Sequence, residues 1–352
     1  MLAFFPQGVP LADRARAFLR PVGWRRSTRC HLFQYERVLG SSLDLRVRAE
    51  NAAVAHRANA AVLAEIDRLE PVFSSFQETS ELRRWQRTIG TAESLSPELL
   101  EVLATAERWQ TLTGGAFHPG AEELTHLWRR AAAAGREPTE GELAEKVARM
   151  EGPLWQLDRA AGTATRLAEC VLTLNAIAKG YIVDRACERA LREPGVQRVL
   201  LNVGGDLRVA SALEDGVGER IGITDPRQDA ENAPLAAQIG VRDGAVASSG
   251  GSRRGLQVGE RWYSHLLNPR TGLPVERVPG ASVVAPTAMD ADALATAFSI
   301  LSPAESLALA DSLPDVACLL MTDDGEFHRS DRWKNWEETG DSVRGAVRDR
   351  ER

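Results

Sequence analysis

Residues 172–184 read LTLNAIAKGYIVD, and the second half of this stretch has the apolar spacing of an amphipathic helix. The first half is unusual, because Asn175 and a run of small residues precede a lone lysine, Lys179, and a glycine, Gly180. A glycine inside a helix costs about 1 kcal/mol relative to alanine, so we expect a specific reason for it. One interpretation is that an anion approaches the start of a helix at Ala176–Arg192, where backbone N–H groups are free. The alternative is an ordinary helix start with a surface lysine.

The rest of the chain mixes short strands with helices and shows no regular β-α-β alternation. We therefore predict an α+β fold, with mixed sheets and packed helices, and not a doubly wound parallel sheet. Helices are expected at Ala52–Leu69, where Pro71 would end the helix, at Pro97–Thr111, at two short segments within Ala131–Met150, and at Met289–Leu301. Strands are expected at Ser42–Arg48, Leu154–Leu157, Ala164–Leu174, Val199–Val203, Leu207–Ala210, Arg220–Thr224, Ala281–Ala285 and Val316–Met321.

The composition excludes several classes of protein. The 352 residues carry a net charge of −6, which provides no basic surface for nucleic acid. The four cysteines form no C-x-x-C pair and the six histidines no H-E-x-x-H spacing, so we predict neither a zinc motif nor a disulfide framework. No apolar run has transmembrane length, and residues 1–30 lack an uninterrupted apolar signal segment. On this ground alone we expect a cytoplasmic protein.

Two residues of one predicted helix are candidates for a metal site. Asp292 and Thr296 lie four residues apart, so their side chains share a face of that helix. A carboxylate and a hydroxyl are oxygen ligands of the kind that Mg²⁺ takes, together with phosphate oxygens and water. The alternative is a polar stripe on a surface helix, which is the more common arrangement.

Three loops contain further candidates, each with a structural alternative. His265 can act as a general base near neutral pH, or it is a buried histidine with a backbone partner. The glycine-rich segment Gln110–Leu124, with Phe117 and His118, is either a ligand loop or an interhelical turn. Asn202–Val209 places two glycines after a buried strand, which allows a ligand or backbone to come close. It does not match the G-x-G-x-x-G motif of dinucleotide-binding folds.

The order of these signals along the chain is far more specific than any one of them. The motifs are G-S-S at Gly40–Ser42, F-S-S-F at Phe73–Phe76, T-G-G-A-F-x-P at Thr113–Pro119, N-A-I-A-K-G-Y-x-V-D at Asn175–Asp184, N-V-G-G-D at Asn202–Asp206, S-S-G-G at Ser248–Gly251, Y-S-H-x-x-N-P-x-T-G-x-P at Tyr263–Pro274 and D-A-L-A-T-A at Asp292–Ala297. This order resembles the ApbE family, the FAD:protein FMN transferases, over about Leu39–Met321. The resemblance implies an ApbE-like, T-fold-related core at 36–333, an N-terminal extension at 1–35 and a charged tail at 334–352.

The resemblance also implies a function and roles for single residues. Members of the family use a divalent metal, here Mg²⁺, to transfer the FMN moiety of FAD to a threonine hydroxyl of an acceptor flavoprotein, and they release AMP. By resemblance, the Ala176 carbonyl, Asp292 and Thr296 hold the metal, and His265 is the base that activates the acceptor hydroxyl. Family members commonly act on the periplasmic side of the membrane, in contrast to the location expected above. The residues implied to contact FAD are Leu39, Phe76, Ala116, Phe117, His118, Thr173, Lys179 and Leu267.

The chain departs from the family pattern at four acidic positions. His118, Thr173, Gly251 and Asn268 stand where family members usually carry an aspartate. We expect FAD binding to persist, with weaker contacts near Thr173 and with one metal ion favoured over two. Two alternatives to the transferase follow: a pyrophosphatase that hydrolyses FAD to FMN and AMP, and a FAD-binding protein without catalysis.

Overall fold

The computed structural model describes residues 30–213, 218–228, 234–250, 255–275 and 280–337. Its first strand begins at Cys30, and Glu337 still forms an ion pair with Arg329, so the described fold extends a few residues beyond 36–333 at both ends. The rest of the predicted extension and tail, 1–29 and 338–352, lies outside the described residues. Of the helices within these ranges, none combines the length and the apolar character that crossing a bilayer requires.

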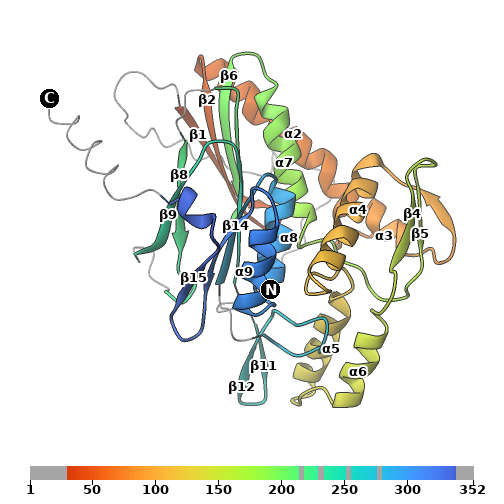
Figure 1. Ribbon diagram of the computed structural model, residues 1–352. Coiled ribbons are helices and arrows are strands. Elements are labelled where there is room, and N and C mark those ends of the chain that lie inside the picture. The colour runs from red at the N-terminus through yellow and green to blue at the C-terminus, as the bar shows by residue number, and fades with distance from the viewer. Residues whose placement is uncertain (1–29, 214–217, 229–233, 251–254, 276–279, 338–352) are drawn as a thin grey trace.

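A sheet of eight strands, paired antiparallel throughout, forms the centre of the molecule (Figure 1). Strands that are distant in sequence lie side by side in it, because the chain leaves the sheet after β2 and returns only with β6. In spatial order the strands are β1 (Cys30–Val38), β2 (Ser41–Ala49), β6 (Val196–Val203), β7 (Asp206–Ser211), β10 (Gly244–Gly250), β13 (Gly280–Ala285), β14 (Ala317–Met321) and β15 (Phe327–Arg329).

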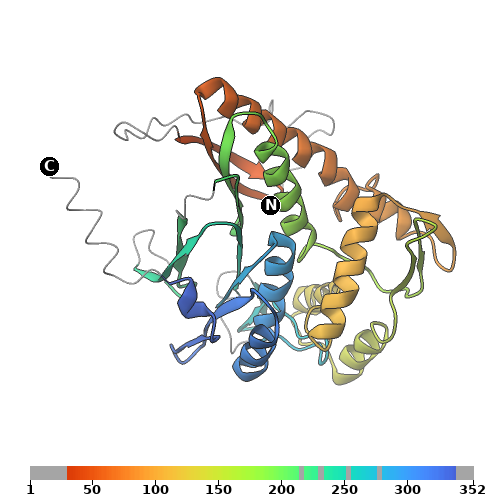
Figure 2. The same cartoon turned by 45° about the horizontal axis from the view of Figure 1, so that its top comes forward.

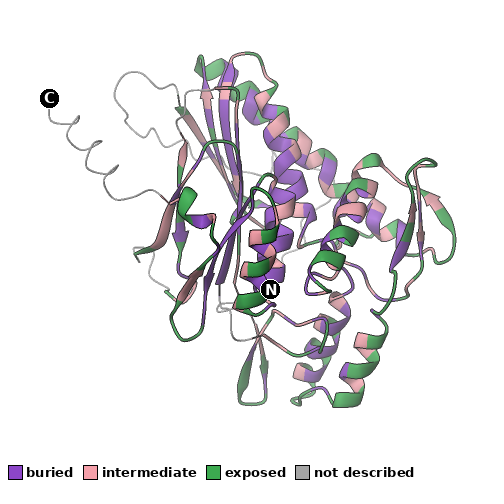
Figure 3. Cartoon of the chain, viewed as in Figure 1, coloured by how far each residue is buried: buried purple, intermediate pink, exposed green. Residues whose placement is uncertain are grey.

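Helices cover one face of this sheet (Figures 1 and 2). Side chains alternate along each strand, so Val199 and Leu201 of β6 pack into the core beneath the helices, whereas Leu200 faces the opposite side. Buried residues accordingly line the strands and the helix surfaces that face them (Figure 3). The covering helices are α2 (Ala52–Phe73), α7 (Ala178–Leu191), α8 (Ala288–Phe298) and α9 (Pro303–Ser312).

The opposite face of the sheet carries a second, smaller core. The antiparallel hairpin of β8 (Glu219–Thr224) and β9 (Leu235–Val241) packs there, through residues such as Ile221 and Ile239. Trp333, at the start of the short 3₁₀ helix η1 (Trp333–Asn335), is fully buried in the same core. This second core explains why the described fold continues past the predicted boundary at residue 333.

The segment between α2 and α7 forms a smaller lobe beside the sheet (Figure 1). A three-stranded antiparallel sheet and four helices build it, and a two-stranded hairpin from later in the chain packs against α5. The helices are α3 (Glu81–Trp85), α4 (Pro97–Leu112), α5 (Glu122–Ala133) and α6 (Glu140–Ala148). The strands are β3 (Ala92–Ser94), β4 (Trp155–Asp158) and β5 (Thr163–Arg166), and the hairpin consists of β11 (Gly255–Val258) and β12 (Arg261–Ser264).

The predicted α+β class is confirmed, but several element boundaries are wrong. Helix α5 begins at Glu122, well before the segment Ala131–Met150 in which the first short helix was expected. Helix α2 does not stop before Pro71 but runs through it to Phe73. Proline lacks the N–H group but has a helical φ angle, so a helix can keep its last turn around it. The strand expected at Ala164–Leu174 ends at Arg166, because only Thr163–Arg166 pairs with neighbouring strands.

Candidate functional site

One cavity of about 830 Å³ lies beside α7 and α8. The β6–β7 turn and the segment that follows β12 also line it. Its walls come from parts of the chain that are far apart in sequence, including the Leu39–Ser41 turn between β1 and β2. Seven of the predicted site residues line it, namely Leu39, Ala176, Lys179, His265, Leu267, Asp292 and Thr296. The structure therefore brings the predicted metal ligands, the lysine and the histidine to a single cavity.

The close packing of α8 against α7 explains why residue 180 is a glycine. A Cβ atom at this position would lie 2.2 Å from the carbonyl oxygen of Ala288, which is backbone and cannot move aside. The close approach that requires a glycine here is therefore that of α7 to α8, and the anion suggested near the start of this helix stays a prediction. The Gly180 N–H donates to Oδ2 of Asp292 at 3.3 Å, so this contact also fixes the carboxylate.

Ala176, just before α7, also lines the cavity. It precedes Ile177, the N-cap of α7, so its carbonyl lies outside the helix, and the Gly180 N–H donates to Asp292. Within the described ranges, neither the Ala176 carbonyl nor the Thr296 hydroxyl forms a hydrogen bond. Together with the Asp292 carboxylate they form a set of oxygen donors that fits a hard divalent cation such as Mg²⁺.

Buried charges surround these oxygen donors. Lys179 Nζ lies 2.8 Å from Oδ2 of Asp206, whose side chain is only 4% exposed. Burial raises the pKa of Asp206, and the Lys179 ammonium opposes that effect. Burial, and then the Asp206 charge, raise the pKa of Asp292 well above its usual range, while Lys179 lowers it. Two buried carboxyl groups thus lie near one lysine, and a bound cation would favour their charged forms.

Asp206 is a site residue that the sequence did not predict. It ends the motif N-V-G-G-D, which the sequence suggested only as a place where a backbone or ligand comes close. The usable signal was an acidic residue directly after two glycines at the end of a buried strand, since that turn places the residue at the end of two neighbouring strands.

Asp184, the last residue of the stretch quoted first, has a structural role. Its carboxylate accepts hydrogen bonds from the backbone N–H groups of Ala288 at 2.8 Å and Met289 at 2.9 Å, at the start of α8. Thr287 caps the same helix by accepting from the Asp290 N–H. Burial raises the pKa of Asp184 to about 6, although both backbone donors act to lower it. Through Asp184 and Gly180, α7 fixes the position of the helix that carries Asp292.

His265 lies on the cavity wall directly after β12 and is exposed. The turn that follows it is held by Asn268, whose backbone carbonyl accepts from the N–H of Gly272 at 2.8 Å. The buried-histidine alternative for His265 is therefore wrong, and an imidazole on an accessible wall suits a general base for a large substrate.

Comparison with known proteins places this site in a family, because residues 39–320 match the ApbE family. The chain belongs to the ApbE family. An FAD:protein FMN transferase of Vibrio cholerae serotype O1 is 32% identical over 272 residues, which cover 74% of this chain and 80% of that protein. Another of Haemophilus influenzae is 29% identical over 262 residues, which cover 72% and 75%. The crystal structure of the ApbE protein of Thermotoga maritima MSB8 has a TM-score of 0.77 at 25% identity and covers 88% of this chain and 100% of that chain.

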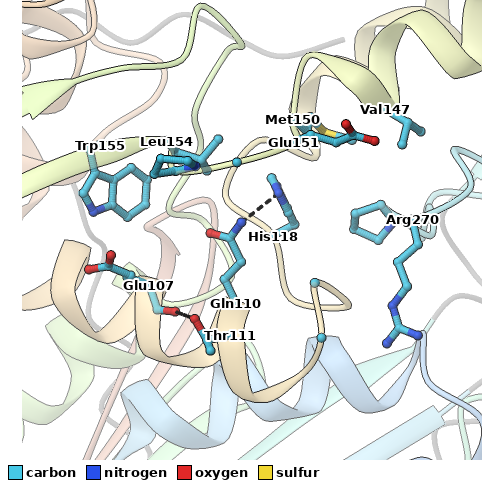
Figure 4. Close-up of a pocket in the computed structure, with 15 residues that line it drawn as sticks. Glu107, Gln110, Thr111, His118, Val147, Met150, Glu151, Leu154, Trp155 and Arg270 are labelled. Atoms are coloured by element: carbon cyan, nitrogen blue, oxygen red, sulfur yellow. Dashed lines mark hydrogen bonds between the residues drawn. The ribbon is translucent and has the colours of Figure 1, made fainter.

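The other residues expected from the ApbE resemblance lie outside this cavity. Phe76 is 81% exposed, whereas Ala116 and Phe117 are buried in the main core. His118 lines a separate cavity of about 660 Å³ on the α4 side of the Thr113–Pro119 loop (Figure 4). Its Nε2 lies 3.0 Å from Gln110 Nε2, a pairing that the opposite orientation of the Gln110 amide would make a hydrogen bond. Their predicted contacts with FAD stay predictions.

The departures from the ApbE pattern share a local geometry. At three of the four positions the replacing side chain accepts a hydrogen bond from the backbone N–H two residues later, as an aspartate can do in a turn. The bonds run from Gly120 N to His118 Nδ1 at 3.0 Å, from Asn175 N to Thr173 Oγ1 at 3.3 Å and from Arg270 N to Asn268 Oδ1 at 3.0 Å. The chain therefore keeps the turn at each of these sites while it loses the negative charge. The fourth position, Gly251, lies outside the described residues.

Proposed function

We propose that this chain is an FAD:protein FMN transferase, which moves the FMN moiety of FAD to a threonine hydroxyl of an acceptor flavoprotein and releases AMP. The observation that carries the proposal is the single cavity shared by Lys179, Asp292, Thr296 and His265. These residues supply positive charge, oxygen ligands and a base, which are the three requirements of phosphoryl transfer from a diphosphate.

The diphosphate of FAD is doubly negative, and the cavity contains groups that bind such a charge. Lys179 provides a point charge at the first turn of α7, where the helix dipole adds positive potential. A divalent cation held by the Ala176 carbonyl, Asp292 and Thr296 would neutralise phosphate charge and stabilise the charge that develops on the AMP leaving group.

His265 supplies the remaining step. The threonine Oγ attacks the phosphorus that carries riboflavin, the P–O bond to AMP breaks, and the hydroxyl proton passes to the imidazole of His265. Because His265 is exposed at the cavity wall, a threonine on the surface of a folded acceptor can reach it. The Leu39 side chain and the buried Leu267 provide apolar surface in the same cavity.

The proposal is tested by incubating the purified chain with FAD, Mg²⁺ and a protein domain that bears an acceptor threonine in a D-x-x-[ST]-G-A-T context. Covalent flavin is read by in-gel fluorescence and AMP by chromatography. We expect fluorescent acceptor with an equal amount of AMP, lost in Asp292→Ala and retained in a matched control, Asp323→Asn, at an exposed turn. AMP with free FMN and no labelled acceptor would instead establish a pyrophosphatase, and unchanged FAD would establish a binding protein without catalysis.

A further inference from the structure

Asp206 carries a charge that the proposed reaction does not by itself require. It is the first residue of β7, directly after the Gly204–Gly205 turn, is almost completely buried, and forms the ion pair with Lys179. Lys179, by contrast, is 30% exposed and faces the cavity. A buried carboxylate behind a cavity lysine suggests that Asp206 acts through the position of that lysine.

The turn that carries Asp206 is built to hold it in place. Gly204 has a φ of +61°, and a Cβ atom there would lie 2.3 Å from the Ser41 hydroxyl and 3.9 Å from Lys179 Nζ. The N–H of Gly205 donates to the Asn202 side chain at 3.0 Å, which closes the turn. The diglycine therefore lets the turn sit against Ser41 and the lysine, and it presents Asp206 in one orientation.

Lys179 has a second carboxylate within electrostatic reach. Asp292 lines the same cavity as Lys179 and Asp206, and the ammonium group favours the charged form of Asp292 while it forms an ion pair with Asp206. A lysine has a flexible stem and an ammonium group that can pair with whichever carboxylate is available. If Asp206 lost its charge, Asp292 would be the remaining buried anion nearby, and Lys179 would compete there with a divalent cation.

We infer that Asp206 is a positioning residue that holds Lys179 away from Asp292 and so keeps this carboxylate available to a divalent cation. The inference rests on the proposed cation site, but it depends on neither the acceptor nor the transfer step. It also explains the two glycines of the turn, because this turn sets the distance between Lys179 and Asp206.

The test is a double-mutant cycle read by metal binding alone. The affinity of the purified full chain for Mn²⁺ is measured from the electron paramagnetic resonance of free Mn²⁺, without FAD, for wild type, Asp206→Asn, Lys179→Met and the double variant. We expect Asp206→Asn to weaken binding by about tenfold to a hundredfold. Removing Lys179 should strengthen binding only slightly in the wild-type background, and at least about tenfold more in the Asp206→Asn background.

Non-additivity is the decisive result, because a simple charge effect would change the affinity by equal factors in both backgrounds. Equal factors, or an unchanged affinity in Asp206→Asn, would overturn the inference, as would a wild-type chain that binds no Mn²⁺. The double variant replaces the ion pair by a neutral pair of similar size. Should Asp206→Asn unfold, Asp206→Ser and its combination with Lys179→Met form the same cycle. If the wild-type chain transfers no flavin but the four Mn²⁺ affinities are still non-additive, the proposed function is contradicted and the inference about Asp206 stands.

Discussion

The corner formed by Lys179, Gly180, Asp206 and Asp292, where α7 meets α8, differs from the Thr113–Pro119 loop in how well its polar groups are partnered. At the corner, Asp206 and Asp292 are buried near Lys179, and the Ala176 carbonyl forms no hydrogen bond within the part of the chain that the structure describes. In the loop, His118 is half-buried, but both of its ring nitrogens have a neighbour within hydrogen-bond distance. Buried charge without full compensation destabilises a fold, so its presence at the corner indicates a ligand, whereas the satisfied loop indicates architecture.

The largest expected effect is on activity at the corner. Asp292→Ala should reduce flavin transfer by at least about a thousandfold, because it removes the only carboxylate among the proposed cation ligands. Initial rates of AMP release measure this effect. Thermal unfolding should change little or rise, since a buried charge is removed as well. A variant with near-normal transfer would show that the corner is not the reactive site.

Gly180→Ala tests whether the corner depends on contact between two helices. The added Cβ atom would meet the Ala288 carbonyl at 2.2 Å, so we expect a loss of about 2–3 kcal/mol in the free energy of unfolding, measured with urea. Gly141→Ala in α6 is the matched control, because a Cβ atom there meets nothing within 4 Å. It should leave stability unchanged or raise it slightly. Equal behaviour of the two variants would contradict the packing argument.

A smaller effect separates turn from charge at a position where the family pattern is lost. Asn268→Ala removes the acceptor for the Arg270 N–H and should cost about 1 kcal/mol, whereas Asn268→Asp keeps the acceptor and should cost nearly nothing. Denaturation curves of both variants provide the comparison. If the aspartate instead raises the transfer rate severalfold without a change in stability, the lost charge matters for the reaction and the turn alone does not explain this position.

The smallest effect is a pH dependence in the loop. Burial lowers the pKa of His118 below the 6.5 of an unfolded histidine, although a hydrogen bond to the Met150 backbone opposes this. Below pH 6.5 the unfolded chain therefore binds more protons than the folded chain, and the contribution of His118 to stability is lost as the pH falls. Between pH 7 and pH 5, the melting temperature of His118→Asn should fall by less than that of the wild type. An identical loss in both proteins would mean that the ring is not buried as a neutral group.

The sequence predicted α2, α4, α7 and α8 and the central strands, because these have a clear apolar period or, as at β6, a continuous apolar run. It missed α3 and α9, whose short sequences carry a weaker pattern. It also predicted the metal-ligand pair, since Asp292 and Thr296 share a helix face. What it could not predict depends on contacts between distant segments. Asp206 becomes a site residue only because the start of β7 lies beside the start of α7, and Gly180 is explained only by Ala288, more than a hundred residues later. His118 was expected near FAD, but its side chain faces a cavity on the other side of its loop.

The amide of Gly180 gives the corner a built-in spectroscopic probe. Its proton points at the carboxylate of Asp292 and not at a carbonyl of its own helix, so its chemical shift depends on the charge state of that carboxylate. In a ¹⁵N-labelled sample this single glycine resonance would move when a cation or FAD reaches the cavity, long before any product forms. The glycine that lets the two helices pack closely thus also reports, through its amide resonance, whether a ligand occupies the cavity.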